Sequence, residues 1–203
     1  MQFDEEGRGI SFQKEGPLDM RMGQDITLTA EKVVNTYSKK ELSEIFKTYG
    51  EERQHKKFAD SIVSARKKKS FRTTKDLSDC IVQAKPSRGK IHPATKIFQA
   101  IRIYINRELE TVESSLKKAI SLLAPGGKIG VISFHSLEDR IVKNIFKEAS
   151  LPARDVRGKI VDLAKFENLT KKPIAPSFLE RRKNARARSA KMRLLRRKCE
   201  VAN

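Results

Sequence analysis

One stretch of the sequence constrains the fold more than any other. Residues 122–127 (LLAPGG) end a helical pattern with a proline and two glycines, and residues 128–134 (KIGVISF) follow as a nearly continuous apolar run. Such a run between turn signals is typical of a buried parallel strand. Ser136 with Asp139 then predicts the capped start of another helix. Helix, tight turn, buried strand and helix indicate an α/β unit of a doubly wound sheet, whose ligands bind beyond the carboxyl ends of its strands.

The chain before this unit has a different pattern. Residues 1–27 show little periodicity and predict a loop or hairpin, whereas residues 28–90 predict a small subdomain of short helices that ends in a linker. Two capping boxes indicate where helices of this subdomain begin, Ser38 with Glu41 and Thr73 with Asp76.

The helix that begins near Pro93 is apolar on most sides, yet it carries one polar stripe. The stripe consists of Thr95, Gln99, Arg102 and Asn106, at spacings of four, three and four residues. Buried polar side chains need partners or a ligand. Arg102 is therefore open to two interpretations, a structural ion pair or a role in binding.

The charge of the chain points to a polyanionic partner. Forty-four Lys and Arg residues against 25 Asp and Glu give a formal net charge of +19, which opposes compaction unless a polyanion balances it. Nucleic acid is the expected partner, because neutralising phosphates supplies most non-specific affinity. Two basic segments, residues 66–69 and 181–198, are expected to meet RNA phosphate, and a solvated charge run is the alternative. Residues 184–198 predict an edge strand or an extended tail.

The sequence contains no metal-ligand pattern. Cys80 and Cys199 lie far apart and fit neither a zinc site nor a disulfide framework, and the three histidines have no ligand spacing, so we expect no metal. No apolar run approaches a membrane span, and the first residues are not those of a signal peptide. The expected compartment is the cytoplasm.

Several blocks, in order along nearly the whole chain, are similar to those of the ribosomal RNA small subunit methyltransferase H family. They are residues 7–12 (GRGISF), 16–22 (GPLDMRM), 49–53 (YGEER), 92–95 (HPAT), 98–103 (FQAIRI), 133–140 (SFHSLEDR) and 185–193 (ARARSAKMR).

The resemblance implies a class I, Rossmann-like methyltransferase fold with an all-helical insert at residues 28–90. Residues 1–27 would follow the fourth strand, and residues 91–203 would form the C-terminal part of the domain with its basic tail. The implied reaction is S-adenosylmethionine-dependent methylation of the exocyclic N4 of a cytidine in the decoding region of 16S rRNA, within the small ribosomal subunit. Of the family's cofactor contacts only Gln2 carries over, because this sequence has no strand with a glycine-rich loop and ribose-binding acid. We therefore expect the N-terminal cofactor-binding part to be missing from the chain.

Candidate site residues come from the densest blocks of the resemblance. The catalytic candidates are Asp19, Arg21, Arg102, His135 and Glu138, and the candidates for RNA binding are Arg186, Arg188 and Lys191. Plain structural roles remain open for the catalytic candidates. Asp19 and Arg21 would close their loop as an ion pair, His135 would be a satisfied histidine at a strand end, and Glu138 would favour a helix N-terminus.

Two hypotheses for the whole chain remain. The first is an rRNA methyltransferase that is short at its front, and the second is an inactive remnant that acts at most as a basic RNA-binding protein. In either case the strand at residues 128–134 is expected to lie beside strands that the chain does not encode, with its apolar side chains and its edge exposed.

Overall fold

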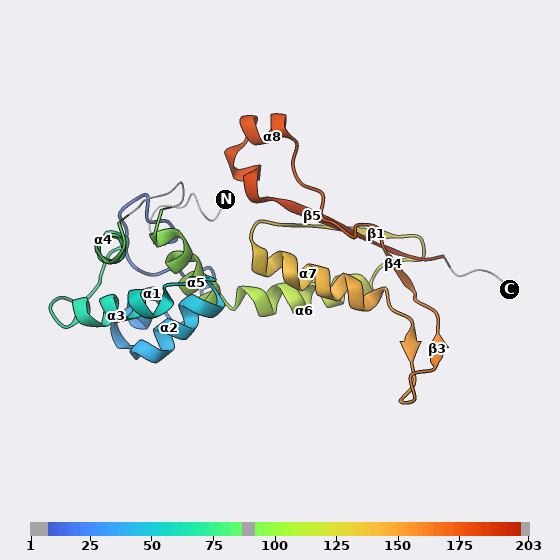
Figure 1. The fold of residues 1–203 in the computed structure, drawn as a ribbon, viewed down its shortest axis with the longest axis horizontal. Coiled ribbons are helices and arrows are strands. Elements are labelled where there is room, and N and C mark those ends of the chain that lie inside the picture. Colours follow the sequence, from blue (N-terminus) through green and yellow to red (C-terminus); the bar gives the residue numbers. More distant parts are fainter. Residues whose placement is uncertain (1–7, 87–91, 200–203) are drawn as a thin grey trace. The chain divides into compact units, whose positions relative to one another are not determined.

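The computed structural model describes residues 8–86 and 92–199 of the 203-residue chain, which forms two compact units, Met1–Glu108 and Leu109–Asn203 (Figure 1). The first unit is helical, and its helices are α1 (Ala30–Thr36), α2 (Lys39–Thr48), α3 (His55–Arg66), α4 (Thr74–Ala84) and α5 (Ala94–Asn106). The predicted capping boxes are confirmed at α2 and α4. In each, the side chain of the first residue accepts a hydrogen bond from the backbone N–H three residues on, and the acidic side chain there accepts one from the first residue's N–H.

All five helices contribute to one apolar cluster. Phe46, Phe58, Leu77, Ile97 and Ile101 are almost completely buried in it. Burying each such side chain is worth about 1.5–3 kcal/mol, so this cluster holds the first unit together.

The loop before α1 packs on the same cluster. Its Leu18 and Met20 are buried, and the Leu18 N–H donates to the Arg72 carbonyl oxygen at 2.9 Å. Gly9 has a φ of +62°, and a Cβ there would lie 1.8 Å from the Pro17 carbonyl oxygen. Only glycine fits this position, because the chain turns against itself there.

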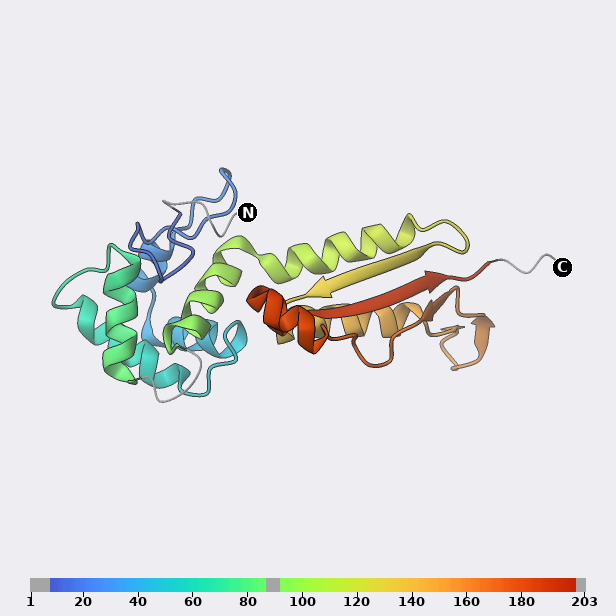
Figure 2. The same cartoon turned by 90° about the horizontal axis from the view of Figure 1, so that it is seen from above.

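The second unit combines helices and strands. Its elements are α6 (Glu108–Ser121), β1 (Lys128–Ser133), α7 (Ser136–Ala149), β2 (Ala153–Arg154), β3 (Ile160–Asp162), β4 (Phe166–Asn168), α8 (Phe178–Lys183), the 3₁₀ helix η2 (Ala185–Ser189) and β5 (Lys191–Arg197). Strands β1, β5 and β4 form a sheet in that order, and β2 pairs with β3 in a separate hairpin. Helices α6 and α7 run along one face of the sheet (Figures 1 and 2).

The predicted strand at residues 128–134 is confirmed as β1, but its description as a buried parallel strand is wrong. β1 pairs antiparallel with β5, Lys128 opposite Arg196 and Ser133 opposite Lys191. Ile129 and Val131 pack against α6 and α7, whereas Ile132 on the other face is 57 % exposed. The strand alternates because helices cover only one face of the sheet. The fold is α/β, with a small antiparallel sheet in the described residues.

Two further predictions are corrected in this unit. The cap of α7 is His135 with Glu138, one residue before the predicted Ser136 with Asp139. The basic C-terminal segment is neither an edge strand nor a tail, because β5 lies between β1 and β4. Leu195 and Arg193 of β5 are 0 % and 4 % exposed. Alternate side chains of this strand are therefore buried on the side of the sheet that faces the helices.

Candidate functional site

Asp19 and Arg21 form a closed ion pair in the loop before α1. Arg21 donates from Nε to Asp19 Oδ1 at 2.8 Å and from Nη2 to Oδ2 at 2.7 Å, and its Nη1 donates to the Ile26 carbonyl oxygen at 3.0 Å. The hydrogen bonds from Arg21 hold the pKa of Asp19 below its ordinary value. Asp19 is therefore an ionised hydrogen-bond acceptor at neutral pH and a weak base.

Asn106, at the end of α5, fixes the backbone of this pair. Its Oδ1 accepts from the Met22 N–H at 2.7 Å, and its Nδ2 donates to the Met20 carbonyl oxygen at 2.9 Å. Met20 has a φ of +65°, which is uncommon for a residue with a side chain, and it is fully buried. Asn106 belongs to the polar stripe of the sequence but was not among the predicted site residues. Its spacing of four residues from Arg102, which puts both on one face of the helix, is the sequence pattern that indicates it.

Arg102 forms the structural ion pair that the sequence left open. Its Nε and Nη2 donate to the two oxygens of Glu108 at 2.7 and 2.9 Å, and both side chains are about 15 % exposed. Asn106 Nδ2 also donates to the Arg102 carbonyl oxygen at 2.8 Å. Asn106 thus ties the backbone on both sides of Arg21 to the backbone of Arg102, whereas the side chains of Arg21 and Arg102 bind separate carboxylates.

His135 and Glu138 form a second group, at the end of β1 and the start of α7. The backbone N–H of Phe134 donates to Glu138 Oε2 at 2.8 Å, and the backbone N–H of Glu138 donates to His135 Nδ1 at 3.4 Å. A histidine here replaces the serine or threonine of an ordinary capping box. Because Nδ1 accepts, the neutral ring carries its proton on Nε2.

The second group has one nitrogen without a hydrogen bond. His135 Nε2 lies 3.3 Å from Glu138 Oε1, but it is not aligned as a donor and has no hydrogen-bond partner among the described residues. Burial raises the pKa of Glu138, but the interaction with His135 and the hydrogen bond from the Phe134 N–H outweigh it, and the net pKa is lowered. Glu138 is thus a second ionised acceptor.

Asp139 lies one residue beyond this group and holds β5 against α7. Arg193 Nε donates to Asp139 Oδ1 at 2.7 Å, and Lys191 Nζ lies 3.4 Å from Oδ2. The hydrogen bond from Arg193 lowers the pKa of Asp139. Lys191, a candidate for RNA binding, is thus placed beside a carboxylate, with its side chain 42 % exposed.

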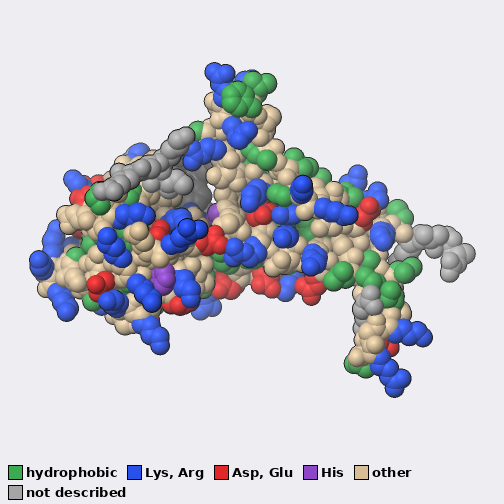
Figure 3. Space-filling view, in the orientation of Figure 1, with side chains coloured by type: hydrophobic (Ala, Val, Ile, Leu, Met, Phe, Trp, Pro, Cys, Tyr) green, Lys and Arg blue, Asp and Glu red, His purple; other side chains and the backbone are tan. Residues whose placement is uncertain are grey.

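The other two RNA candidates lie on a segment that extends beyond the sheet. We call residues 177–190, which contain α8 and η2, the basic arm. Every residue from 177 to 186 is exposed, as is Arg188. Figure 3 shows basic and apolar side chains gathered at the end of this arm. Arg186 and Arg188 are exposed on this arm and accessible to a polyanion.

The glycines of the described residues do not form a cradle for a nucleoside cofactor. Gly9 packs on the carbonyl oxygen of Pro17 in its own loop, and Gly127 donates its N–H to the Ala124 carbonyl oxygen in the turn before β1. Within residues 8–86 and 92–199, no strand leads into a glycine-rich loop at the start of a helix, which is how nucleotide cofactors are commonly held. Gln2, the cofactor residue carried over from the resemblance, lies outside the described residues.

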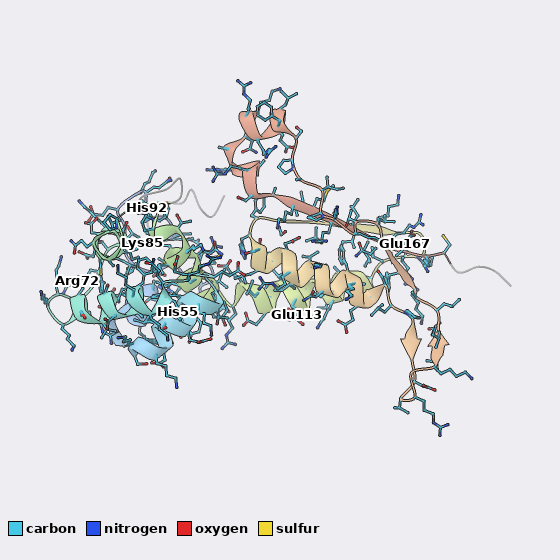
Figure 4. The ribbon with its side chains drawn as sticks, in the orientation of Figure 1. His55, Arg72, Lys85, His92, Glu113 and Glu167 are labelled. Carbon is cyan, nitrogen blue, oxygen red and sulfur yellow. The ribbon has the colours of Figure 1, made fainter. Side chains whose placement is uncertain are left out.

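The two histidines outside the candidate groups, His55 and His92, contact a serine and a phenylalanine. His55 Nδ1 lies 2.8 Å from Ser43 Oγ, and the ring of His92 stacks on Phe12 at 4.6 Å between centroids (Figure 4). In the part of the chain that the structure describes, no group of three His, Cys, Asp or Glu side chains is placed to hold a metal ion. None of the described helices has the length and apolarity of a membrane span.

The sequence comparisons define the class of the protein. The profile of the MraW methylase family matches residues 1–198, and the chain belongs to this family of methyltransferases. Curated relatives that bear the name ribosomal RNA small subunit methyltransferase H are 52 % identical over 193 residues in Persephonella marina, 46 % over 200 in Fusobacterium nucleatum and 47 % over 202 in Streptococcus mutans. These matches confirm the family resemblance derived from the sequence blocks.

The lengths of the relatives differ from that of this chain. The matches cover 94 %, 97 % and 96 % of the chain, but only 62 %, 64 % and 63 % of the respective relatives. The chain therefore spans a little under two thirds of the relatives it matches.

Proposed function

We propose that the chain is part of an enzyme that methylates N4 of a cytidine in the decoding region of 16S rRNA, with S-adenosylmethionine as methyl donor, in the bacterial cytoplasm. The observation that carries this proposal is the 46–52 % identity to enzymes named ribosomal RNA small subunit methyltransferase H. The net charge of +19 supports an RNA substrate. Within that enzyme, residues 28–90 are proposed as a helical insert in a Rossmann-like domain.

The candidate residues suit the chemistry of a cytosine amine. This amine is a poor nucleophile because its lone pair is delocalised into the ring, so the protein must orient it and accept hydrogen bonds from its protons. Asp19 and Glu138 both have lowered pKa values and are acceptors at neutral pH. We propose one of these carboxylates for that role, with Arg21 and His135 as their respective positioning partners. S-adenosylmethionine supplies the electrophilic methyl group when it is bound.

The described residues provide no site that fits the nucleoside of the cofactor. We propose that S-adenosylmethionine is held by Gln2 together with a segment that corresponds to the part of the relatives that the chain does not match. The net charge of +19 and the exposed basic arm favour a second candidate function, in which the chain binds RNA without methyl transfer.

Calorimetry separates the two candidates. The chain alone is expected to show no micromolar affinity for S-adenosylmethionine. A chimera that adds the unmatched segment of the Persephonella marina relative is expected to bind the cofactor and to form N4-methylcytidine in small ribosomal subunits, measured by mass spectrometry of the nucleosides. Micromolar binding by the chain alone would contradict the placement of the cofactor. A chimera that binds the cofactor but methylates nothing would favour RNA binding without methyl transfer.

RNA binding is expected for the chain alone, with an affinity that falls steeply with salt. Reversal of charge at Arg186 and Arg188 should reduce the slope of log K against log salt by about 0.7–0.9 for each phosphate that is no longer neutralised. A matched control reverses Lys56 and Lys57, which are exposed in the first unit. Equal slopes for the two double variants would show that the basic arm is not the RNA surface.

A further inference from the structure

We propose that Phe178, at the end of the basic arm, stacks on an unpaired base of the RNA substrate. This inference rests on the proposed function for the identity of the RNA. It adds a substrate contact of a different kind from the phosphate contacts of the arginines, since the base plane itself is held by an aromatic ring.

The exposure of Phe178 has no structural explanation within the described chain. Helix α8 has no buried residue, and the side chains of Phe178 and Leu179 are 64 % and 67 % exposed. An apolar side chain stabilises a fold by being buried, so the exposed ring of Phe178 contributes little to folding stability. Adjacent exposed apolar side chains with a polar surround are typical of an interaction site.

The surround of Phe178 is strongly basic. The arm and the first residue of β5 carry six basic side chains, Arg181, Arg182, Lys183, Arg186, Arg188 and Lys191, against the single acidic Glu180. In Figure 3 the apolar surface at the end of the arm lies directly among basic side chains. This charge matches a phosphate backbone, which would bring a polynucleotide to the ring.

Arg182 gives the ring a second feature of base recognition. Its guanidinium carbon lies 5.8 Å from the centroid of the Phe178 ring, within the range of a cation–π contact. The contact steadies the ring and places a positive charge beside it, so that a base and its phosphate can be held together. Proteins that bind single-stranded nucleic acid combine these two elements, aromatic rings for the bases and a basic surface for the backbone.

The same features favour unpaired RNA over other polyanions. Bases within a duplex are already stacked on one another, so a side chain on the surface reaches only their edges and the backbone. An anionic membrane would be held by a wide apolar face, and α8 has only six residues with two large apolar side chains. A methyltransferase must also take its target base out of a stack, which leaves bases unpaired near the site.

The test uses the full 203-residue chain and four substitutions. Phe178→Ala removes the ring, Phe178→Trp keeps an aromatic surface, Leu179→Ala is the matched apolar control on the same helix, and Arg182→Lys keeps the charge without the planar group. The probes are a short single-stranded RNA that contains 2-aminopurine, a duplex RNA of the same length, and vesicles of anionic phospholipid. Circular dichroism checks that each variant keeps its helix content.

Phe178→Ala is expected to weaken binding of the single strand about fivefold or more and to abolish the quenching of 2-aminopurine, because base–aromatic stacking is substantial for each base. Phe178→Trp should restore both signals. Leu179→Ala, and all binding to the duplex, should change less than twofold. Arg182→Lys should give an intermediate loss for the single strand, because the charge remains without the planar contact.

Other outcomes would overturn the proposal. Equal losses for Phe178→Ala and Leu179→Ala would mean a general apolar contact, and a loss confined to the vesicles would mean a membrane contact. If the unsubstituted chain binds RNA with a steep salt dependence but Phe178→Ala changes nothing, the stacking inference fails while the proposed function stands. If the unsubstituted chain binds no RNA, both fail.

Discussion

Removal of the Asp139 carboxylate should destabilise the second unit far more than removal of an exposed carboxylate. Asp139 accepts hydrogen bonds from Arg193 at 2.7 and 3.2 Å, and the two side chains are 12 % and 5 % exposed. Arg193 Nη1 has no partner among the described residues, so Asp139→Ala would leave a buried guanidinium without its counter-charge. Breaking a buried pair from one side costs about 3–5 kcal/mol. We expect a loss of about 3 kcal/mol, the lower end of this range. Lys191, the second cation beside Asp139, is 42 % exposed, so water can solvate its charge once the carboxylate is removed.

The control is the exposed pair on α6. Glu113 and Lys117 are 50 % and 56 % exposed, and Glu113→Ala should cost about 0.3–0.5 kcal/mol. Glu113 lies on the outer side of the helix in Figure 4. The double variant Asp139→Leu with Arg193→Met should recover most of the stability, because it leaves no unpaired charge.

Urea unfolding with hydrogen exchange measures these effects. With a slope of about 1–2 kcal/mol per molar, Asp139→Ala should lower the urea midpoint of β1 and β5 by about 1.5–3 M. Amides of α2 and α3 in the first unit serve as the internal reference and should not shift. Equal small shifts for Asp139→Ala and Glu113→Ala would refute the argument, as would a double variant no more stable than the single one.

Three further predictions concern the first unit. The pKa of Asp76 in the folded chain is lowered to about 2, because the hydrogen bonds that its carboxylate accepts at the start of α4 outweigh the effect of burial. The ionised carboxylate therefore stabilises the fold fully above the ordinary pKa of 3.8, and this stabilisation disappears as the pH falls through about 2. Asp76→Asn should flatten the acid limb of a curve of unfolding free energy against pH. Asn106→Ala removes the hydrogen bonds to the Met22 N–H and the Met20 carbonyl oxygen, and should lower the free energy of unfolding by about 1–3 kcal/mol. The Met22 amide should then exchange faster with solvent. Gly9→Ala should lower the melting temperature by several degrees, since its Cβ would lie 1.8 Å from the Pro17 carbonyl oxygen, and an unchanged melting curve would contradict the described turn.

Features that depend on neighbours in sequence were predictable. The capping boxes of α2 and α4 need only residues three positions apart, and the sequence located both. At α7 two such pairs are offset by one residue. His135 with Glu138 forms the cap in place of the predicted Ser136 with Asp139, and Asp139 instead pairs with Arg193, 54 residues away.

Features that depend on distant partners were not predictable. The apolar run of β1 indicated a strand, but nothing within it encodes the direction of its neighbour, and its partner β5 begins near residue 191. The polar stripe on α5 showed that Asn106 needs a partner without showing that Met20, 86 residues earlier, supplies it. For the candidate site, the sequence named the charged residues and His135 but missed Asn106, and the structure added the hydrogen bonds that hold each group together.

The central position of β5 changes how the basic end of the chain can be manipulated. Arg193 and Arg196 of this strand are engaged with Asp139 and Glu167, and the strand is hydrogen-bonded on both sides, to β1 and to β4. A C-terminal deletion intended to remove positive charge would therefore remove the middle of the sheet and confuse unfolding with loss of RNA affinity. Individual charge substitutions on the arm avoid this error, and a count of Lys and Arg residues in the sequence overstates the number of cations that can release counterions from RNA.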